Sequence, residues 1–128
     1  MLYFQRPQNF LTIFIAIYLA QFSLTVTAVE CIIGFGQQKG GPALCNDKDF
    51  VQWKCQTPSC SRDGHLWIPM TSCLYNGVAG SGVSNQQCAS YNLQFQGNYE
   101  CINPGRNRYL CPYTPSNVPF ITCTSCYK

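Results

Sequence analysis

The sequence predicts a small, disulfide-rich, mainly β protein made of two tandem duplicated modules. Cysteine accounts for 10 of the 128 residues, and all of them follow residue 28, a density typical of disulfide scaffolds in oxidising compartments. After residue 28 no sustained helical period occurs, whereas short segments of alternating polarity are bounded by turn residues. A third observation, an internal repeat of the cysteine pattern, indicates the duplication.

The repeat matches four cysteines of the first half, in order, with four of the second half. They are Cys31, Cys45, Cys55 and Cys73 in the first copy and Cys88, Cys101, Cys111 and Cys126 in the second. In both copies nine residues separate the second cysteine from the third, and an aromatic residue stands two positions before the third. We therefore predict a first module over residues 29–75 and a second over residues 88–128. Residues 76–87, rich in glycine and small polar residues, are expected to form a flexible linker between them.

Residues 1–28 have the pattern of a secretory signal. Arg6 is their only charged residue, an apolar stretch follows over residues 10–20, and Val26 and Ala28 satisfy the small-x-small rule for cleavage after Ala28. The apolar stretch is shorter than the ~20 residues of a membrane-spanning helix. We expect a secreted mature protein that starts at Val29, is soluble and has no membrane association after signal removal.

Each module is expected to contain a β-hairpin between its second and third cysteines. In the second copy, residues 103–106 read Asn-Pro-Gly-Arg, which favours a type II turn between strands over residues 99–102 and 107–111. In the first copy, residues 46–49 read Asn-Asp-Lys-Asp at the same place, and a strand follows over residues 50–55. The sequence thus predicts the same hairpin twice, with different turn residues.

Cysteine number alone leaves the disulfide connectivity open, because ten cysteines allow about 945 pairings. The repeat narrows the choice, since only Cys60 and Cys123 have no counterpart in the other copy. We expect all ten cysteines to form disulfides. Each copy contains an odd number of cysteines, so at least one bond must then join the two copies. We predict that this bond is Cys60–Cys123.

Charge and motifs exclude several functions. The chain contains 8 basic and 5 acidic residues, and this small excess, without clustered lysine and arginine, disfavours nucleic acid or anionic lipid as a partner. The single histidine, His65, lies in a cysteine-rich loop without a recognisable nucleophile motif. We therefore expect neither enzymatic activity nor a bound cofactor.

The loop in which the two copies differ is the main candidate for binding. Residues 60–66 make this loop four residues longer in the first copy than in the second. With the second hairpin turn, it supplies the candidate binding residues Arg62, Asp63, His65, Arg106 and Arg108. A loop held by a disulfide loses little entropy on association. One alternative function follows, a secreted inhibitor of extracellular proteases with Arg62 or Arg106 as the reactive residue.

A second alternative is a zinc-binding module. Cys55, Cys60, His65 and Cys73 follow one another in the order C-x4-C-x4-H-x7-C, and zinc accepts three thiolates with one imidazole. This alternative requires reduced cysteines, which are found in the interior of a host cell rather than outside it.

Three cysteines have an aromatic residue two positions earlier. The triplets are Trp53-Lys54-Cys55, Tyr99-Glu100-Cys101 and Tyr109-Leu110-Cys111. With the signal, the small size and the even cysteine number, they resemble the (Y/F/W)xC secreted effector candidates of rust and mildew fungi. The resemblance implies a virulence protein of a plant pathogen that binds a host component, foremost a host protein, and interferes with host immunity. It implies no catalytic residues and leaves translocation into host cells open.

Overall fold

The structure is a computed structural model that describes residues 27–94, 96–113 and 119–128. The predicted signal, apart from its last two residues, lies outside the described residues. The described chain forms eleven β-strands and one short 3-10 helix, η2 (Thr57–Ser59). The strands are β1 (Thr27–Glu30), β2 (Gly34–Gly36), β3 (Ala43–Asn46), β4 (Gln52–Cys55), β5 (Cys60–Ser61), β6 (Ile68–Tyr75), β7 (Val83–Cys88), β8 (Ser90–Leu93), β9 (Asn98–Ile102), β10 (Arg108–Pro112) and β11 (Thr122–Tyr127). The protein is therefore small and mainly β, as predicted. Within the described ranges, no helix has the length and apolar character needed to cross a bilayer.

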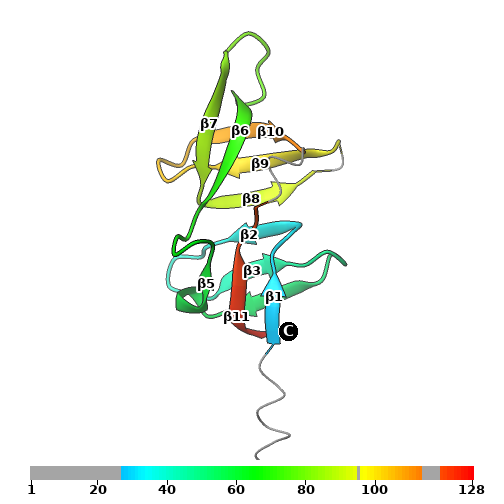
Figure 1. Cartoon of the computed structure of the whole chain (residues 1–128), viewed down its shortest axis with the longest axis vertical. Helices are drawn as coiled ribbons and strands as arrows, with labels where there is room; N and C mark the ends of the chain where they lie inside the picture. The colour runs from blue at the N-terminus through cyan, green and yellow to red at the C-terminus, as the bar shows by residue number, and fades with distance from the viewer. Residues whose placement is uncertain (1–26, 95, 114–118) are drawn as a thin grey trace, which may run out of the picture.

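The strands form one antiparallel sheet in the order β1-β11-β4-β3-β2-β8-β9-β10-β6-β7, with β5 attached to β11. Figure 1 shows this sheet folded into two units, one above the other. We call β1 to β5 with β11 the lower unit, and β6 to β10 the upper unit. Strands β2 and β8 pair with each other and join the two units.

The two units do not coincide with the modules predicted from the repeat. β6 falls within residues 29–75, but it pairs with β10 and β7 in the upper unit. β11 falls within residues 88–128, but it pairs with β1 and β4 in the lower unit. The last strand of each predicted module therefore lies in the unit formed mainly by the other.

The linker expected over residues 76–87 is instead part of a β-hairpin. β6 pairs with β7, which begins at Val83, and the intervening residues make the turn. Gly77, Gly80 and Gly82 in this turn have positive φ angles, which glycine adopts without steric cost. The composition that indicated a flexible linker thus reflects a glycine-rich turn followed by a polar strand whose alternate residues are exposed.

All ten cysteines form disulfides, and none is free. The bonds are Cys31–Cys45, Cys55–Cys126, Cys60–Cys123, Cys73–Cys111 and Cys88–Cys101. The predicted Cys60–Cys123 bond is confirmed. It joins the two predicted modules in sequence, but in space it lies inside the lower unit, because β5 and β11 are neighbours there.

The strand pairings of one unit recur in the other. In each unit a half-cystine pairs with an aromatic residue on both neighbouring strands, as in Phe35, Cys45 and Trp53 of the lower unit and Tyr91, Cys101 and Tyr109 of the upper unit. Phe35 and Tyr91, which hold equivalent places, also pair with each other across the boundary. Antiparallel pairing of equivalent positions is the arrangement of an isologous contact with two-fold symmetry.

The two predicted hairpins form, but the second does not have the predicted type II turn. A type II turn needs a positive φ angle at Gly105; instead Arg106 has a φ of 65°, and Phe50 at the equivalent place has 62°. Each of these two residues donates its backbone N–H to the carbonyl three residues earlier, at Asp47 or Asn103. The side chains of Asp47 and Asn103 also accept the backbone N–H four residues later, at 3.0 and 2.9 Å. Both hairpins therefore have the three-residue loop in which a type I turn is followed by a left-handed residue.

Two tyrosines of the upper unit bind the backbone of the lower unit. The buried Tyr91 hydroxyl donates a 2.6 Å hydrogen bond to the Cys31 carbonyl and accepts one of 2.9 Å from the Ile121 N–H. The Tyr99 hydroxyl donates to the Ile32 carbonyl at 2.9 Å. Together with the β2–β8 pairing, these bonds fix the two units relative to each other.

Candidate functional site

Arg62, Asp63 and His65 come together in a two-residue hairpin turn. The backbones of Arg62 and His65 exchange hydrogen bonds of 2.8 and 2.9 Å, and Asp63 and Gly64 between them have φ angles of 51° and 79°. Asp-Gly with positive φ at both central positions is typical of a type I′ turn. The Arg62 guanidinium lies 5.8 Å from the centre of the Phe120 ring. The loop is thus a tight turn whose arginine packs against the protein surface.

Arg106 and Arg108 lie in the other unit, in the β9–β10 hairpin. Arg106 is exposed at the left-handed position of the turn, whereas Arg108 forms a 2.9 Å ion pair with Glu100. The five predicted binding residues therefore divide between two separate hairpins. Proteases bind the chain around the scissile bond in an extended form, as in strand addition. Neither Arg62 nor Arg106 lies in such a segment, so no geometric feature favours the inhibitor alternative.

The four residues of the predicted zinc site are not brought together. Cys55 and Cys60 are bonded to cysteines of β11, and Cys73 is bonded to Cys111 in the upper unit. The fourth predicted ligand, His65, is exposed and stacks on the Trp67 ring at 4.5 Å. Metal binding by cysteine needs thiolates, which disulfide sulfurs cannot supply. The three cysteines of the predicted zinc site therefore belong to disulfides, two in the lower unit and one in the upper unit.

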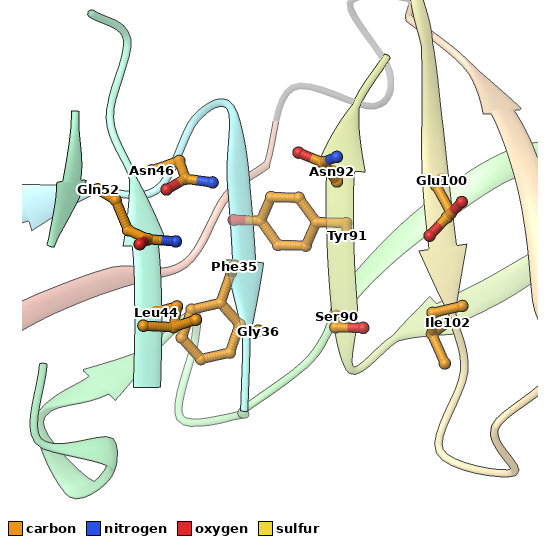
Figure 2. Close-up of a pocket in the computed structure, with 10 residues that line it drawn as sticks. All are labelled: Phe35, Gly36, Leu44, Asn46, Gln52, Ser90, Tyr91, Asn92, Glu100 and Ile102. Atoms are coloured by element: carbon orange, nitrogen blue, oxygen red, sulfur yellow. The ribbon is translucent and has the colours of Figure 1, made fainter. Parts of the chain in front are cut away.

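A different site lies where the two units meet. A hollow of about 250 Å³ extends over the paired strands β2 and β8 and reaches β3 and β9 on either side. Figure 2 shows the side chains that surround it. Three amides, one carboxylate and two aliphatic side chains stand around its rim: Asn46, Gln52, Asn92, Glu100, Leu44 and Ile102.

The hollow exists because β2 contains two glycines on the strand face that points into it. A Cβ atom at Gly36 would meet nothing within 4 Å, so the floor there is open backbone. A Cβ atom at Gly34 would lie 3.1 Å from the Asn92 Oδ1 atom and 3.2 Å from the Asn46 Nδ2 atom. Figure 2 shows these two amides facing each other from opposite sides of β2. Any larger residue at Gly34 would force them apart.

The polar groups of the hollow differ in how they are paired. The Glu100 carboxylate accepts hydrogen bonds from the Arg108 Nε atom at 2.9 Å and from the Gln94 Nε2 atom at 3.1 Å. The side-chain amides of Asn46, Gln52 and Asn92, in contrast, have no hydrogen bond to another described residue. The three amides are therefore available to a ligand, whereas the one carboxylate is already neutralised.

Two further hollows adjoin the first one and share residues with it. The larger, of about 520 Å³, is lined by Asn46 and Asn92 and by the apolar side chains of Ile33, Phe50 and Leu93. The smaller, of about 340 Å³, again includes Asn92 and continues along the chain past the end of β8. We call the three connected hollows the junction groove. Phe50 is 73% exposed at its edge.

Burial and hydrogen bonding shift the pKa values of three groups near the junction, Tyr91, Tyr99 and Asp47. Burial raises the pKa of Tyr91 well above its usual value and that of Tyr99 to about 12. Both therefore remain neutral donors over the whole physiological range. The Trp53 indole N–H, 3.0 Å from the Asp47 carboxylate, lowers the pKa of that group. Tyr91 also lines the first hollow, but its hydroxyl is bound to the Cys31 carbonyl and the Ile121 N–H, so these groups hold the framework that presents the junction groove.

Sequence reasoning did not find the junction groove. It forms only because β2 pairs with β8, two strands from different halves of the chain. The available signal was the Gly34-Phe35-Gly36 segment, in which glycines alternate with a buried aromatic residue. Such a pattern indicates a strand whose second face lacks side chains, but it does not say what lies above that face.

No protein-family model, curated protein or solved structure shows a significant match to this chain. The disulfide framework and the junction groove are therefore the features from which function can be argued.

Proposed function

We propose that the protein is a secreted effector of a plant-pathogenic fungus that binds a host component and thereby interferes with host immunity. The observation that carries this proposal is the junction groove, an open site with three amides that bond no other described residue, on a framework of five disulfides. A preformed site on a covalently fixed scaffold loses little entropy when a ligand binds. Binding rather than catalysis is the activity that such a site supports best.

Secretion is supported by the disulfides as well as by the predicted signal. Disulfides persist in oxidising compartments and are rare where glutathione keeps thiols reduced. Nine of the ten half-cystines are 3% exposed or less, and Cys126 is 7% exposed. Burial shields these bonds from reductants, which suits a protein that acts in the fluid around host cells.

The aromatic-x-cysteine triplets have a structural role that fits the effector resemblance. Trp53 and Tyr109 pair across the sheet with Cys45 and Cys101, and both pack against the core. Tyr99 pairs in the same way with Cys111. Each aromatic residue thus lies beside a half-cystine on the same face of the sheet. The triplets belong to the scaffold, and we assign binding to the junction groove instead.

We further propose that the two units arose by tandem duplication, followed by exchange of the last strand. The recurring register, the matched turns at Phe50 and Arg106, and the equivalent bonds Cys31–Cys45 and Cys88–Cys101 support this origin. The duplication would explain why the junction groove lies on the line between equivalent strands, where two copies of one surface meet.

The effector function is tested by immune assays with a variant that fills the junction groove. Gly36→Val adds a side chain over the open floor, where a Cβ atom meets nothing within 4 Å, and valine is a residue that favours strands. Asn85→Val on the exposed face of β7 is the matched control. We expect the wild-type protein and Asn85→Val to weaken the oxidative burst of leaf tissue treated with an elicitor, and Gly36→Val to lose this effect. An inactive wild-type protein, or full activity of Gly36→Val, would contradict the proposal.

A further inference from the structure

We infer that the junction groove binds a neutral oligosaccharide chain. This inference rests on the proposed function, because it names the chemical class of the host component that the groove recognises. It follows from the hydrogen-bonding groups, the charge, the available backbone and the apolar surfaces of the groove.

The hydrogen-bonding groups match hydroxyls. Each side-chain amide offers two N–H donors and a carbonyl acceptor in one plane, and a sugar hydroxyl both donates and accepts. Asn46, Gln52 and Asn92 come from three different strands and surround one hollow. Since none of them bonds another described residue, a ligand with several hydroxyls could satisfy all three without breaking a hydrogen bond within the described part of the chain.

The charge of the groove disfavours ionic ligands. Glu100 is the only acidic or basic side chain among the described residues that line the three hollows, and the Arg108 guanidinium pairs with it at 2.9 Å. Phosphate and carboxylate ligands are bound by free arginine or lysine, which the lining lacks. A cationic ligand would have to compete with Arg108. A neutral ligand meets neither obstacle.

The backbone of the groove disfavours an extended peptide. Peptides commonly bind by adding a strand to an open sheet edge, where the main chain supplies the hydrogen bonds. At the junction, β2 is paired with β3 and β8, and β8 is paired with β2 and β9. Neither strand has a free edge to offer. Recognition must therefore use side chains, as it does for ligands that have hydroxyls in place of peptide groups.

The apolar residues of the groove suit the C–H faces of sugar rings. Leu44 and Ile102 border the first hollow, and Leu93 with the exposed Phe50 ring borders the second. The negative face of an aromatic ring attracts the slightly positive hydrogens of a C–H group. The three hollows share Asn92, and each is lined by amides as well as by apolar side chains. Such a groove fits several linked sugar units better than a single small molecule.

Calorimetric titration with defined oligosaccharides tests the inference. The probes are linear neutral hexasaccharides of β-1,3-glucan, β-1,4-glucan, xylan and chitin, with an acidic oligogalacturonate for comparison. We expect at least one neutral probe to bind and the acidic probe not to bind. Affinity should fall by ~10-fold or more in Gly36→Val, by roughly 3- to 10-fold in Asn92→Ala through the loss of hydrogen bonds, and not at all in Asn85→Val. Intact mass before and after reduction confirms that every variant retains its disulfides.

The inference is overturned if no neutral probe binds, if only the acidic probe binds, or if Gly36→Val binds as tightly as the wild type. These outcomes are separable from the effector function. If Gly36→Val loses its effect on the oxidative burst while no neutral oligosaccharide binds the wild type, the groove has another ligand, such as a peptide, and the effector proposal stands. If an oligosaccharide binds but the wild-type protein does not weaken the oxidative burst, the oligosaccharide inference stands and the effector proposal fails.

Discussion

At the scale of single residues, Tyr91 is the side chain that connects the two units most directly. It is 3% exposed, and its hydroxyl both donates to Cys31 and accepts from Ile121 in the other unit. The side chain alternates with exposed Asn92 along β8, as is usual for a half-buried strand. Its partners were not predictable, because they depend on how the two units pack and not on local pattern.

We expect Tyr91→Phe to lower the free energy of unfolding by about 1–3 kcal/mol, because it leaves a buried carbonyl and a buried N–H without a partner. The measurement is equilibrium unfolding in guanidinium chloride. Tyr127→Phe, at a tyrosine that is 56% exposed, is the matched control and should change stability little. Equal effects of the two substitutions would show that the Tyr91 hydroxyl bonds do not hold the junction.

The raised tyrosine pKa values predict a loss of stability in alkali. Tyr99 has an ordinary value of 10.0 and a folded value of about 12, so the unfolded chain loses its proton at a lower pH than the folded chain does. The stabilisation is therefore complete below about pH 10 and is lost as the pH rises towards 12. Unfolding measured between pH 8 and pH 11 should show this decline, and Tyr99→Phe should make it shallower. A stability that stays constant up to pH 11 would contradict it.

At the scale of elements, the hairpins show what local sequence determines. Turn residues and alternating strands predicted both hairpins at the right places, because Asp47 and Asn103 form their hydrogen bonds within a few residues. The turn type was wrong, since Pro-Gly suggested a left-handed Gly105 while the left-handed residue is Arg106. The Asn103 side chain accepts a hydrogen bond from the Asn107 N–H, and this bond favours the three-residue loop over a two-residue turn.

Substitutions at the left-handed residues of these two turns should affect stability and ligand binding differently. A bulky residue with positive φ is strained, so Phe50→Gly and Arg106→Gly should each raise the free energy of unfolding, by about 0.5–1 kcal/mol after the entropy cost of glycine. Only Phe50 lines the junction groove. Thermal unfolding and oligosaccharide titration should show that both variants are stabilised while Phe50→Gly alone binds more weakly. A loss of binding in Arg106→Gly would contradict this assignment.

At the scale of the whole molecule, the repeat predicted which segments are equivalent but not which unit each one joins. A last strand makes the same contacts whether it packs in its own unit or in the neighbouring one, so sequence pattern cannot distinguish the two arrangements. The junction groove could not be predicted for the same reason. It requires the pairing of Phe35 with Tyr91 across the two units.

The arrangement of disulfides predicts that they contribute unequally to stability. Cys60–Cys123 spans 63 residues, but Cys55–Cys126 already holds the neighbouring strands together. It therefore closes only a short additional loop, whereas Cys73–Cys111 closes a span of 38 residues in the other unit. In the chain-entropy model, replacing Cys60 and Cys123 by alanine should cost roughly 1 kcal/mol less than replacing Cys73 and Cys111. Denaturant unfolding of the two double variants measures this difference, and the opposite order would refute it.

The open ends of the lower unit have a consequence for chain connectivity. β1 and β11 correspond by their pairings to β7 and β6, and Val29, the predicted first residue of the mature chain, lies opposite Cys123 in β11. In the upper unit the matching strand ends are joined by the turn at residues 76–82, which protrudes at the top of Figure 1. The molecule should therefore tolerate circular permutation: a short peptide that connects β11 to β1, with new termini within residues 78–81, would exchange the roles of the two units. The permuted chain should form the same five disulfides and the same groove, with the lower unit now continuous in sequence.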